Sequence, residues 1–300
     1  METDKQRGVL ITGGRGFIGR SVGKLLQCHG YRGISLDRAP AGSNDVVCDI
    51  TDLAELETVF RRERIDAIVH LAAILPTAAQ REPLVATKVN VQGSFNLLEL
   101  ARQFGVRRFI FGSSLSVYGT CPAHQVVTEM DRAAPEDLYG AAKLYVEQLG
   151  EAYRQALGLE FVSLRIGRVV GAGARSATSA WRSDIFECLE KANPAEIDIP
   201  YEDSERILLI HVEDVARMIL QLLHAPRPAH CVYNAACESV IVGELKSEIE
   251  RLNPRLRVTL GGQVVVGNPR RVEWSRFAGE FGFEIVPVFE QLGAAADGRH

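Results

Sequence analysis

The chain lacks the marks of a membrane, secreted or nucleic-acid-binding protein. No apolar run in its 300 residues approaches the roughly 18 that a membrane span needs. Residues 1–7 give no apolar core for a signal peptide. A formal net charge of −4 provides no basic surface for a polyanion. We therefore expect a cytoplasmic protein with no membrane and no nucleic-acid partner.

Cysteine and histidine patterns typical of disulfides or metal sites are also missing. The six cysteines are scattered and include no C-x-x-C pair, which favours free thiols in a reducing compartment. His70 and His211 lie far apart without a local ligand pattern, so we interpret them as structural histidines and expect no metal. The chain contains no internal repeat, and its length allows one or two domains.

A glycine-rich segment is the most informative feature that is present. Residues 12–19 read TGGRGFIG, between the apolar run 9–11 and a helical pattern. Gly13 permits a tight turn, Gly16 lets the backbone approach a pyrophosphate, and Gly19 lets the helix pack closely. The helix N-terminus offers N–H groups to phosphates. Asp37 ends the next apolar run at about the spacing of a ribose-binding carboxylate. This order predicts a dinucleotide site.

The rest of the sequence alternates apolar runs with helical patterns. The predicted strands are 9–12, 33–37, 45–48, 67–71, 109–112 and 161–166, and the predicted helices between them are 17–28, 53–63, 84–104 and 138–157. Beyond residue 167 we expect shorter strands, helices near 181–192, 212–223, 242–252 and 275–281, and a loose tail over 294–300. The pattern predicts an α/β Rossmann fold, a doubly wound parallel sheet with a smaller C-terminal substrate lobe. Residues 1–167 would form the dinucleotide-binding domain and 168–300 mainly the lobe, with some segments returning to the core.

A candidate acid/base pair opens the predicted helix 138–157. Tyr139 and Lys143 lie four residues apart and share one helical face. An ammonium lowers the pKa of a nearby phenol from about 10, so the pair can move a proton while a cofactor moves a hydride. Ser113 and Ser114 follow a predicted strand, at the sheet edge where ligands bind. Alone, the pair could be a surface contact and the serines could cap a turn.

Taken together, these motifs make the chain resemble the extended short-chain dehydrogenase/reductases, also called NAD-dependent epimerase/dehydratases. The matching pieces keep the family's order over roughly residues 8–235. They are TGGRGFIG at 12–19, Asp37, DI at 49–50, HLAA at 70–73, NVQG at 90–93, SSLSVYG at 113–119, Tyr139 with Lys143, LR at 164–165 and HVEDVA at 211–216.

The resemblance implies NAD as the cofactor and assigns roles to the matching residues. The residues expected to bind NAD are Gly13, Gly16, Phe17, Ile18 and Gly19 at the pyrophosphate, Asp37 and Arg38 at the adenosine ribose, Asp49 and Ile50 at the adenine, and Leu71, Ala72, Ala73, Asn90, Ser113, Tyr139, Lys143 and Gly167 elsewhere along it. Tyr139 would be the catalytic acid/base, with Lys143 as its helper and Ser114 on the substrate oxygen. Asp37 would repel a 2′-phosphate and favour NAD over NADP, whereas Arg38 could accept that phosphate.

The sequence departs from the family's sugar-nucleotide members at the substrate. Arg168 stands where those members often carry the asparagine of L-R-x-x-N. Ile207 stands where they often carry an arginine, and Arg206 is one residue away, which in a strand means the other face. The segment 176–186 adds hydroxyls and Arg182. We interpret Arg168 and Arg182, with Ser114, as candidate substrate-binding residues for a small anion such as a carboxylate. The alternative is that Arg182 only solvates a helix.

Three functions remain open from the sequence. The first is an NAD-dependent dehydrogenase or epimerase that acts on a secondary alcohol of a sugar, sugar acid or related polyol. The second is a UDP-sugar 4-epimerase with an unusual phosphate clamp, and the third is a non-catalytic NAD-sensing regulator. The intact set of Ser114, Tyr139 and Lys143 argues against the regulator. The small-molecule substrate is the expected partner, together with a second copy of the chain, because family dimers pack through the helices at 84–104 and 138–157.

Overall fold

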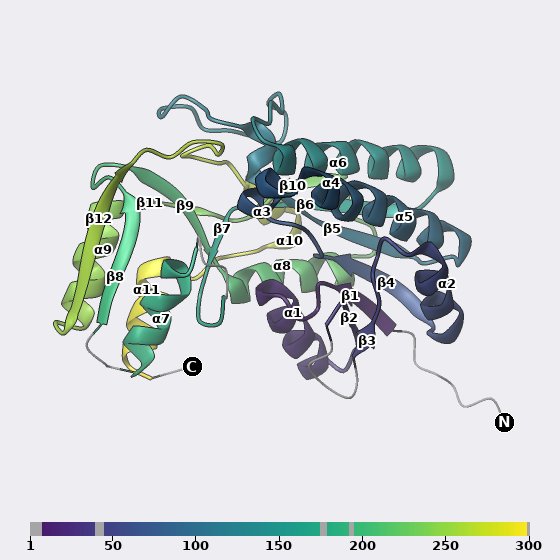
Figure 1. Ribbon diagram of the computed structural model, residues 1–300, viewed down its shortest axis with the longest axis horizontal. Coiled ribbons are helices and arrows are strands. Elements are labelled where there is room, and N and C mark those ends of the chain that lie inside the picture. The colour runs from purple at the N-terminus through teal and green to yellow at the C-terminus, as the bar shows by residue number, and fades with distance from the viewer. Residues whose placement is uncertain (1–7, 40–44, 175–178, 192–194, 299–300) are drawn as a thin grey trace.

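A seven-stranded parallel sheet forms the centre of the computed structural model, which describes residues 8–39, 45–174, 179–191 and 195–298 (Figure 1). The strands run in the order β10-β6-β5-β4-β1-β2-β3. Their bounds are β1 (Gly8–Thr12), β2 (Arg32–Asp37), β3 (Val46–Val47), β4 (Ile65–His70), β5 (Arg108–Ser114), β6 (Glu160–Ile166) and β10 (Val232–Asn234). Because β1 pairs with both β2 and β4, the strand order reverses there. Ligands of such sheets bind at the carboxyl ends of the strands beside this point.

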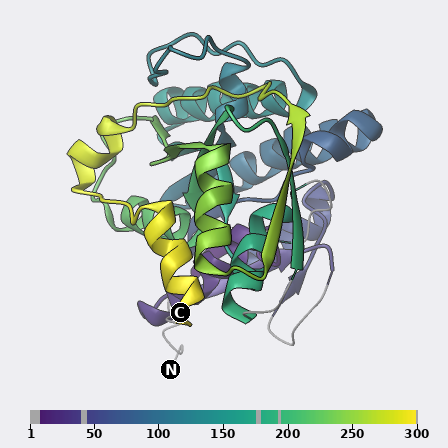
Figure 2. The same cartoon turned by 90° about the vertical axis from the view of Figure 1, so that its left-hand side faces the viewer.

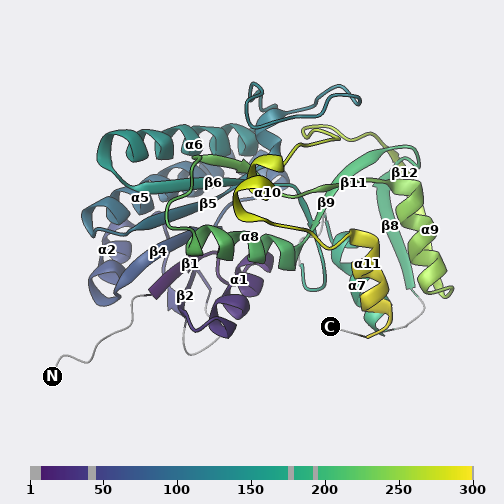
Figure 3. The same cartoon turned by 180° about the vertical axis from the view of Figure 1, so that it is seen from behind.

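Both faces of the sheet are buried, so adjacent residues of one strand enter different cores. Val9 and Ile11 pack with helices of one face, and Leu10 packs with helices of the other. The helices are α1 (Phe17–Cys28) and α8 (Val212–His224) on the first face, and α2 (Leu53–Arg62), α5 (Ser94–Gln103) and α6 (Leu138–Leu157) on the second. Figures 1 and 3 show the resulting three layers. The predicted doubly wound Rossmann sheet is confirmed.

A smaller part of the chain packs around a separate core that includes Trp181, Phe186 and Leu245. Its elements are β7 (Arg168–Val170), α7 (Trp181–Lys191), β8 (Ala195–Tyr201), β9 (Arg206–His211), β11 (Glu238–Ile241), α9 (Val242–Leu252), β12 (Leu256–Gln263) and α11 (Val288–Ala296). Figure 2 shows α9 and α11 side by side next to the β8–β12 pair. Between these elements the chain returns to the large part at α8, β10 and α10 (Ser275–Phe281), whose Phe277 enters the first core.

Several sequence-based expectations need correction. The strands of the smaller part are not all short, since β8 has 7 residues and β12 has 8. The loose tail predicted over 294–300 is wrong as far as Ala296, because α11 buries Leu292 and Ala295; residues 299–300 lie outside the described residues. The predicted helix 84–104 is interrupted, as α4 (Pro83–Thr87) and α5 flank a π-helical turn over Lys88–Gly93. A short helix that was not predicted, α3 (Pro76–Arg81), precedes it.

The predicted helices 138–157, 242–252 and 275–281 are confirmed residue by residue. All the cysteines are free thiols, as expected. Among the helices of the described ranges, none combines the length and the apolar character of a membrane span.

Arg108, at the start of β5, is fully buried and joins the sheet to the end of α8. Its Nη1 donates to the carbonyl oxygens of Leu222 (2.6 Å), Leu223 (3.2 Å) and Ala225 (2.5 Å). Its Nη2 donates to Glu160 at 2.7 Å. The last carbonyls of a helix have no partner within the helix and carry partial negative charge, so the guanidinium stabilises the end of α8 by bonding two of them and the C-cap carbonyl.

We predict that Arg108→Met destabilises the fold by about 3–5 kcal/mol, because the carbonyls of α8 and the Glu160 carboxylate lose their buried partner. Denaturant unfolding followed by circular dichroism measures this change. Arg107→Ala is the matched control, since that neighbouring side chain is 42% exposed and its ion pairs should contribute less than about 1 kcal/mol. Equal losses in the two variants would show that Arg108 is not the link proposed.

Candidate active site

The turn between β1 and α1 is built from glycines that leave no room for side chains. Gly13 has φ +65°, and a Cβ there would lie 2.8 Å from the Ala72 nitrogen. A Cβ on Gly19 would lie 2.2 Å from the Gly13 carbonyl oxygen. Gly16 is the N-cap of α1 and supplies no side-chain cap, so the first-turn N–H groups remain available. The predicted phosphate cradle therefore has the required backbone geometry.

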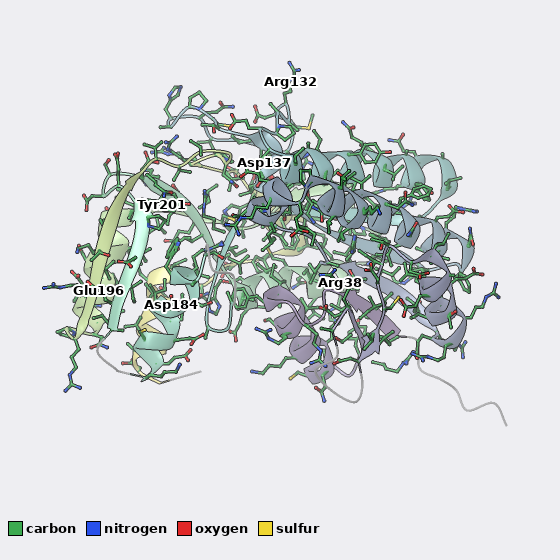
Figure 4. All side chains as sticks on the ribbon, in the orientation of Figure 1. Arg38, Arg132, Asp137, Asp184, Glu196 and Tyr201 are labelled. Atoms are coloured by element: carbon green, nitrogen blue, oxygen red, sulfur yellow. The ribbon has the colours of Figure 1, made fainter. Side chains whose placement is uncertain are left out.

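A cavity of about 560 Å³ opens beside this turn, within the usual size range of ligand sites. All the predicted site residues line it except Asn90 and Arg168. Sequence reasoning missed further lining residues, namely Arg15, Arg20, Leu36, Cys48, Ile74, Leu75, Val89, Gly112, Ile166, Val169, Gly173, Ala174 and Ser179. Figure 4 labels Arg38, which lines the cavity, on the large part, and Tyr201 on the smaller part.

Asp37 ends β2 and lines the cavity, where we expect the adenosine ribose. Its Oδ2 accepts the Arg15 N–H at 3.2 Å, and its Oδ1 accepts the Arg38 N–H at 2.8 Å. A carboxylate has about four lone-pair sites, so acceptor capacity remains for ribose hydroxyls. The Arg15 guanidinium forms an ion pair with Asp45, which offsets its positive charge beside Asp37.

Asn90 lies behind the cavity wall, in the π-helical turn that interrupts the predicted helix. Its Oδ1 accepts the Ile74 N–H at 2.7 Å, and its Nδ2 donates to the Ile74 carbonyl at 2.9 Å. Ile74 itself lines the cavity. Asn90 therefore fixes the wall and does not line the cavity, although we expected it among the residues that bind NAD.

His70 links three elements beneath the cavity. Its Nδ1 lies 2.6 Å from Thr12 Oγ1 in β1, and its Nε2 lies 2.8 Å from Ser94 Oγ in α5. Burial lowers the pKa of His70 to about 3, and the Lys143 charge acts in the same direction. A neutral imidazole with both nitrogens bonded is a structural histidine, as its sequence context suggested.

Ser114 has the capping role that was one of the two alternatives left open by the sequence. Its Oγ accepts the Ser116 N–H at 3.1 Å and so caps the 3-10 helix Leu115–Tyr118. The predicted role of this hydroxyl on the substrate oxygen stays a prediction, and Ser114 lines the cavity together with Tyr139. Ser113 Oγ is buried and has no hydrogen-bond partner among the described residues, which leaves it for a ligand.

Lys143 is buried and directed toward β5. Its Nζ donates to the Gly112 carbonyl at 2.6 Å and lies 4.5 Å from the centre of the Phe111 ring, a cation–π contact. The same Nζ is 5.4 Å from the centre of the Tyr139 ring. Burial lowers the pKa of the Lys143 ammonium to about 7, and the Glu147 carboxylate opposes this shift.

The pKa of the Tyr139 phenol is raised, mainly by burial and also by the Asp137 charge. The nearby Ser114 hydroxyl lowers this pKa and so acts in the opposite direction. The expectation that Lys143 lowers the pKa of Tyr139 is therefore wrong for the protein itself, because the ammonium is directed to the Gly112 carbonyl and is not among the groups that shift the phenol.

A buried polar network holds the helix of Tyr139 and Lys143 from behind. Glu147, one turn after Lys143, accepts from Arg165 at 2.7 Å and from Ser163 at 3.1 Å. Arg165 also donates to Tyr118 OH at 2.7 Å and stacks over its ring. Tyr118 OH donates in turn to Asn234 at 2.8 Å. Sequence reasoning named Arg165 and Tyr118 only as parts of motifs and missed Glu147 and Asn234.

Arg168 and Arg182 lie near one another at the start of the smaller part. Arg182 lines the cavity, whereas Arg168 stacks over the Tyr201 ring at 5.6 Å and does not line it. Burial lowers the pKa of Arg182 to about 10, and the Arg168 charge adds to this shift. Arg168 Nη1 is buried without a hydrogen-bond partner in the described ranges. Of the hydroxyl-rich segment 176–186, residues 176–178 lie outside those ranges.

Arg206 is directed away from the cavity. It donates to the Ser239 carbonyl at 3.5 Å, and its neighbour Ile207 is completely buried. Neither residue lines the cavity. The one-residue offset between Ile207 and Arg206 thus leaves no arginine of this strand at the cavity.

The residues present fit a bound dinucleotide. Two buried polar atoms without partners among the described residues belong to residues that line the cavity, Arg15 Nε and Ser113 Oγ. Buried polar atoms normally have partners, so two at one site indicate a polar ligand. The glycine turn and Asp37 would hold the pyrophosphate and the adenosine ribose, and Ser113 would face the remainder.

A parallel sheet with a glycine-rich turn at its switch point defines the dinucleotide-binding α/β enzymes. Within that class, the model of the NAD dependent epimerase/dehydratase family matches residues 9–236. The chain belongs to this family, and NAD is its cofactor. It is thus an enzyme of the extended short-chain dehydrogenase/reductase type.

Curated relatives of the chain include enzymes with different substrates. Mitochondrial L-threonine 3-dehydrogenase of Bos taurus is 27% identical over 86% of this chain and 71% of its own length. UDP-glucose 4-epimerase of Lacticaseibacillus casei is 35% identical over 55% of this chain and 52% of its own. Uronate dehydrogenase of Pseudomonas syringae pv. tomato is 31% identical over 61% of this chain and 68% of its own.

Solved structures share the complete fold. UDP-glucose 4-epimerase of Thermus thermophilus, in complex with NAD, superimposes with a TM-score of 0.83 over 97% of this chain and 98% of its own. Its sequence is 24% identical, so the likeness shows the fold and not the substrate.

We predict that Tyr139→Phe removes nearly all turnover and leaves NAD affinity almost unchanged, because only the proton-transferring hydroxyl is lost. A positioned acid or base typically contributes about 10²–10⁴-fold to the rate. Steady-state kinetics and NAD titration measure the two effects. Turnover within a few-fold of the wild type would remove Tyr139 from this role.

We predict that NAD binds more tightly than NADP and that Asp37→Ala narrows the difference. The carboxylate repels a 2′-phosphate and accepts from ribose hydroxyls, and the variant loses both effects. Titration of each cofactor against both proteins gives the ratio of affinities. An unchanged ratio would show that Asp37 does not face the ribose.

Proposed function

We propose that the protein is an NAD-dependent dehydrogenase that oxidises a secondary alcohol on a small acidic substrate, such as a sugar acid or a related hydroxy acid. The observation that carries this proposal is the pair of Arg182 and Arg168, with Arg182 on the cavity wall. The two guanidiniums, which are only partly exposed, repel one another, and the groups that shift the pKa of Arg182 include no carboxylate. A substrate carboxylate would offset this repulsion through paired hydrogen bonds.

Each of the three catalytic residues would have a separate role in the oxidation of the alcohol. NAD supplies a hydride acceptor when it is bound. Ser114 would hydrogen-bond the substrate oxygen, and Tyr139 would take its proton in the phenolate form, which the positive charges of Lys143 and of bound NAD would favour. The Lys143 ammonium has three donor hydrogens. One is donated to the Gly112 carbonyl, so two remain for the ribose hydroxyls of the cofactor.

Some of the relatives are named for acidic substrates and others for nucleotide sugars, so the choice between the two classes rests on the residues of this chain. L-threonine and uronates, named for two of the dehydrogenases, each carry a carboxylate beside hydroxyl groups. UDP-glucose, named for the epimerase, carries a diphosphate instead. The arginine that would be expected to grip a diphosphate is replaced here by Ile207, and Arg206 is directed to Ser239.

We also propose that two copies of the chain form a homodimer through α4, α5 and α6. These helices expose several large apolar side chains. Monomeric proteins rarely expose large apolar patches. The exposed side chains are Leu84 (82% exposed), Phe95 (39%), Leu138 (50%) and Tyr145 (52%).

Substrate class is tested by an activity and thermal-shift screen with NAD present. The screen compares UDP-sugars with uronates, aldonates and other hydroxy acids. We expect NADH formation and stabilisation with an acidic compound. Turnover of a UDP-sugar alone would contradict the proposal and favour the 4-epimerase.

The arginine pair gives the matching variant test. Arg182→Lys and Arg168→Lys should each raise KM for the acidic substrate about ten-fold or more, because lysine cannot copy a two-point contact worth about 1.5–3 kcal/mol. KM for NAD should not change. Arg206→Lys is the control, as its guanidinium donates to the Ser239 carbonyl and is not part of the arginine pair. An equal effect on KM in all three variants would refute a specific anion site.

A further inference from the structure

Arg20, in the first turn of α1, joins two segments that are far apart in the sequence. Its Nη1 donates to the Arg15 carbonyl at 2.7 Å, within the glycine turn. Its Nη2 donates to the Gly173 carbonyl at 2.6 Å, in the turn after β7. Figure 1 shows this turn descending beside α1. We name this pair of hydrogen bonds the Arg20 bridge.

The far end of the Arg20 bridge is anchored to helix α7. The Gly173 N–H donates to Glu187 at 3.1 Å. Ser183 Oγ donates to the Gly171 carbonyl at 2.6 Å and accepts the Ala174 N–H at 2.8 Å. The turn 171–174 and α7, which carries Arg182, therefore form one hydrogen-bonded unit of the smaller part.

Both ends of the bridge face the cavity. Arg15, Gly16 and Arg20 line it from the glycine turn, and Gly173 and Ala174 line it from the smaller part. Gly173 has φ +100°, and a Cβ there would lie 3.3 Å from the Arg20 guanidinium, so a side chain would crowd the contact. A pyrophosphate on the glycine turn would therefore lie next to the bridge.

We propose that Arg20 is a positioning residue that holds the turn 171–174 beside the bound pyrophosphate and slows release of the reduced cofactor. NADH cannot leave the glycine turn freely while that turn is tied to the smaller part. The inference rests on NAD as the cofactor and not on the identity of the substrate.

The size of the effect follows from the exposure of Arg20. Hydrogen bonds from a charged donor contribute modestly when water competes for them. Loss of both should speed release about five- to twenty-fold. A bridge made by one exposed side chain breaks often, so it delays NADH without retaining it permanently, as a dehydrogenase requires.

The test is stopped-flow release of NADH from the full-length protein, followed by NADH fluorescence after mixing with excess NAD. Arg20→Ala and Arg20→Lys should both release NADH about five- to twenty-fold faster than the wild type. Lysine keeps the charge but offers one nitrogen where the bridge uses two. Lys24→Ala, an exposed cation one turn further along α1, is the control and should behave as the wild type.

Two outcomes would overturn the proposal. Unchanged release in both Arg20 variants would show that the bridge does not hold the cofactor. Wild-type release in Arg20→Lys with fast release in Arg20→Ala would show that positive charge near the phosphates is sufficient. The thermal midpoint without cofactor should stay the same in every variant, which separates release from a loss of fold.

Discussion

The contact of Gly19 with the Gly13 carbonyl, with no side chain between them, fixes where α1 meets the sheet. A Cβ at Gly19 would lie 2.2 Å from that oxygen, so any other residue would push the helix away. Because α1 starts there, its free N–H groups face the cavity. Arg20 reaches Gly173 from the first turn of the same helix. The cofactor cradle and the link to the smaller part thus depend on one close approach of backbone.

The opposite side of the cavity is fixed by buried charge. Glu147 and Arg165 are both buried, and their pairing holds α6 on β6. A buried pair is costly to break because the remaining partner stays uncompensated. Lys143 and Tyr139 stand one and two turns before Glu147, so their positions follow from this pairing. Rigid support of this kind is what a proton-transfer group needs to keep its geometry.

Local signals made much of the fold predictable from the sequence. Helix α6 has Asp137 as its N-cap and Gly158, in a left-handed conformation, after its last turn, and its predicted bounds were right. The glycine turn and the β–α alternation of the large part are equally local. The two strands β8 and β12 were underestimated because each depends on pairing with a partner far along the chain. In β8 only Ile197 and Ile199 face the core.

Residues of the candidate site could be predicted from the sequence where they belong to short local motifs, and not where they depend on distant partners. Ser114, Tyr139 and Lys143 belong to short motifs, so they could be named from sequence. Arg108 and Arg20 could not, because their partners lie 114 and 153 residues away. The pKa of Tyr139 could not be inferred either, since burial and the direction of the Lys143 ammonium are three-dimensional properties.

The winding of the chain has an evolutionary consequence. After β6 the polypeptide enters the smaller part, returns for α8 and β10, leaves for β11 and α9, and returns again at α10 before ending in α11. No single cut separates the two parts, so the smaller one cannot be exchanged between proteins as a gene segment. New substrates must instead be acquired by point substitution and by insertions in turns, on α7 and its neighbours, while every return path stays in place.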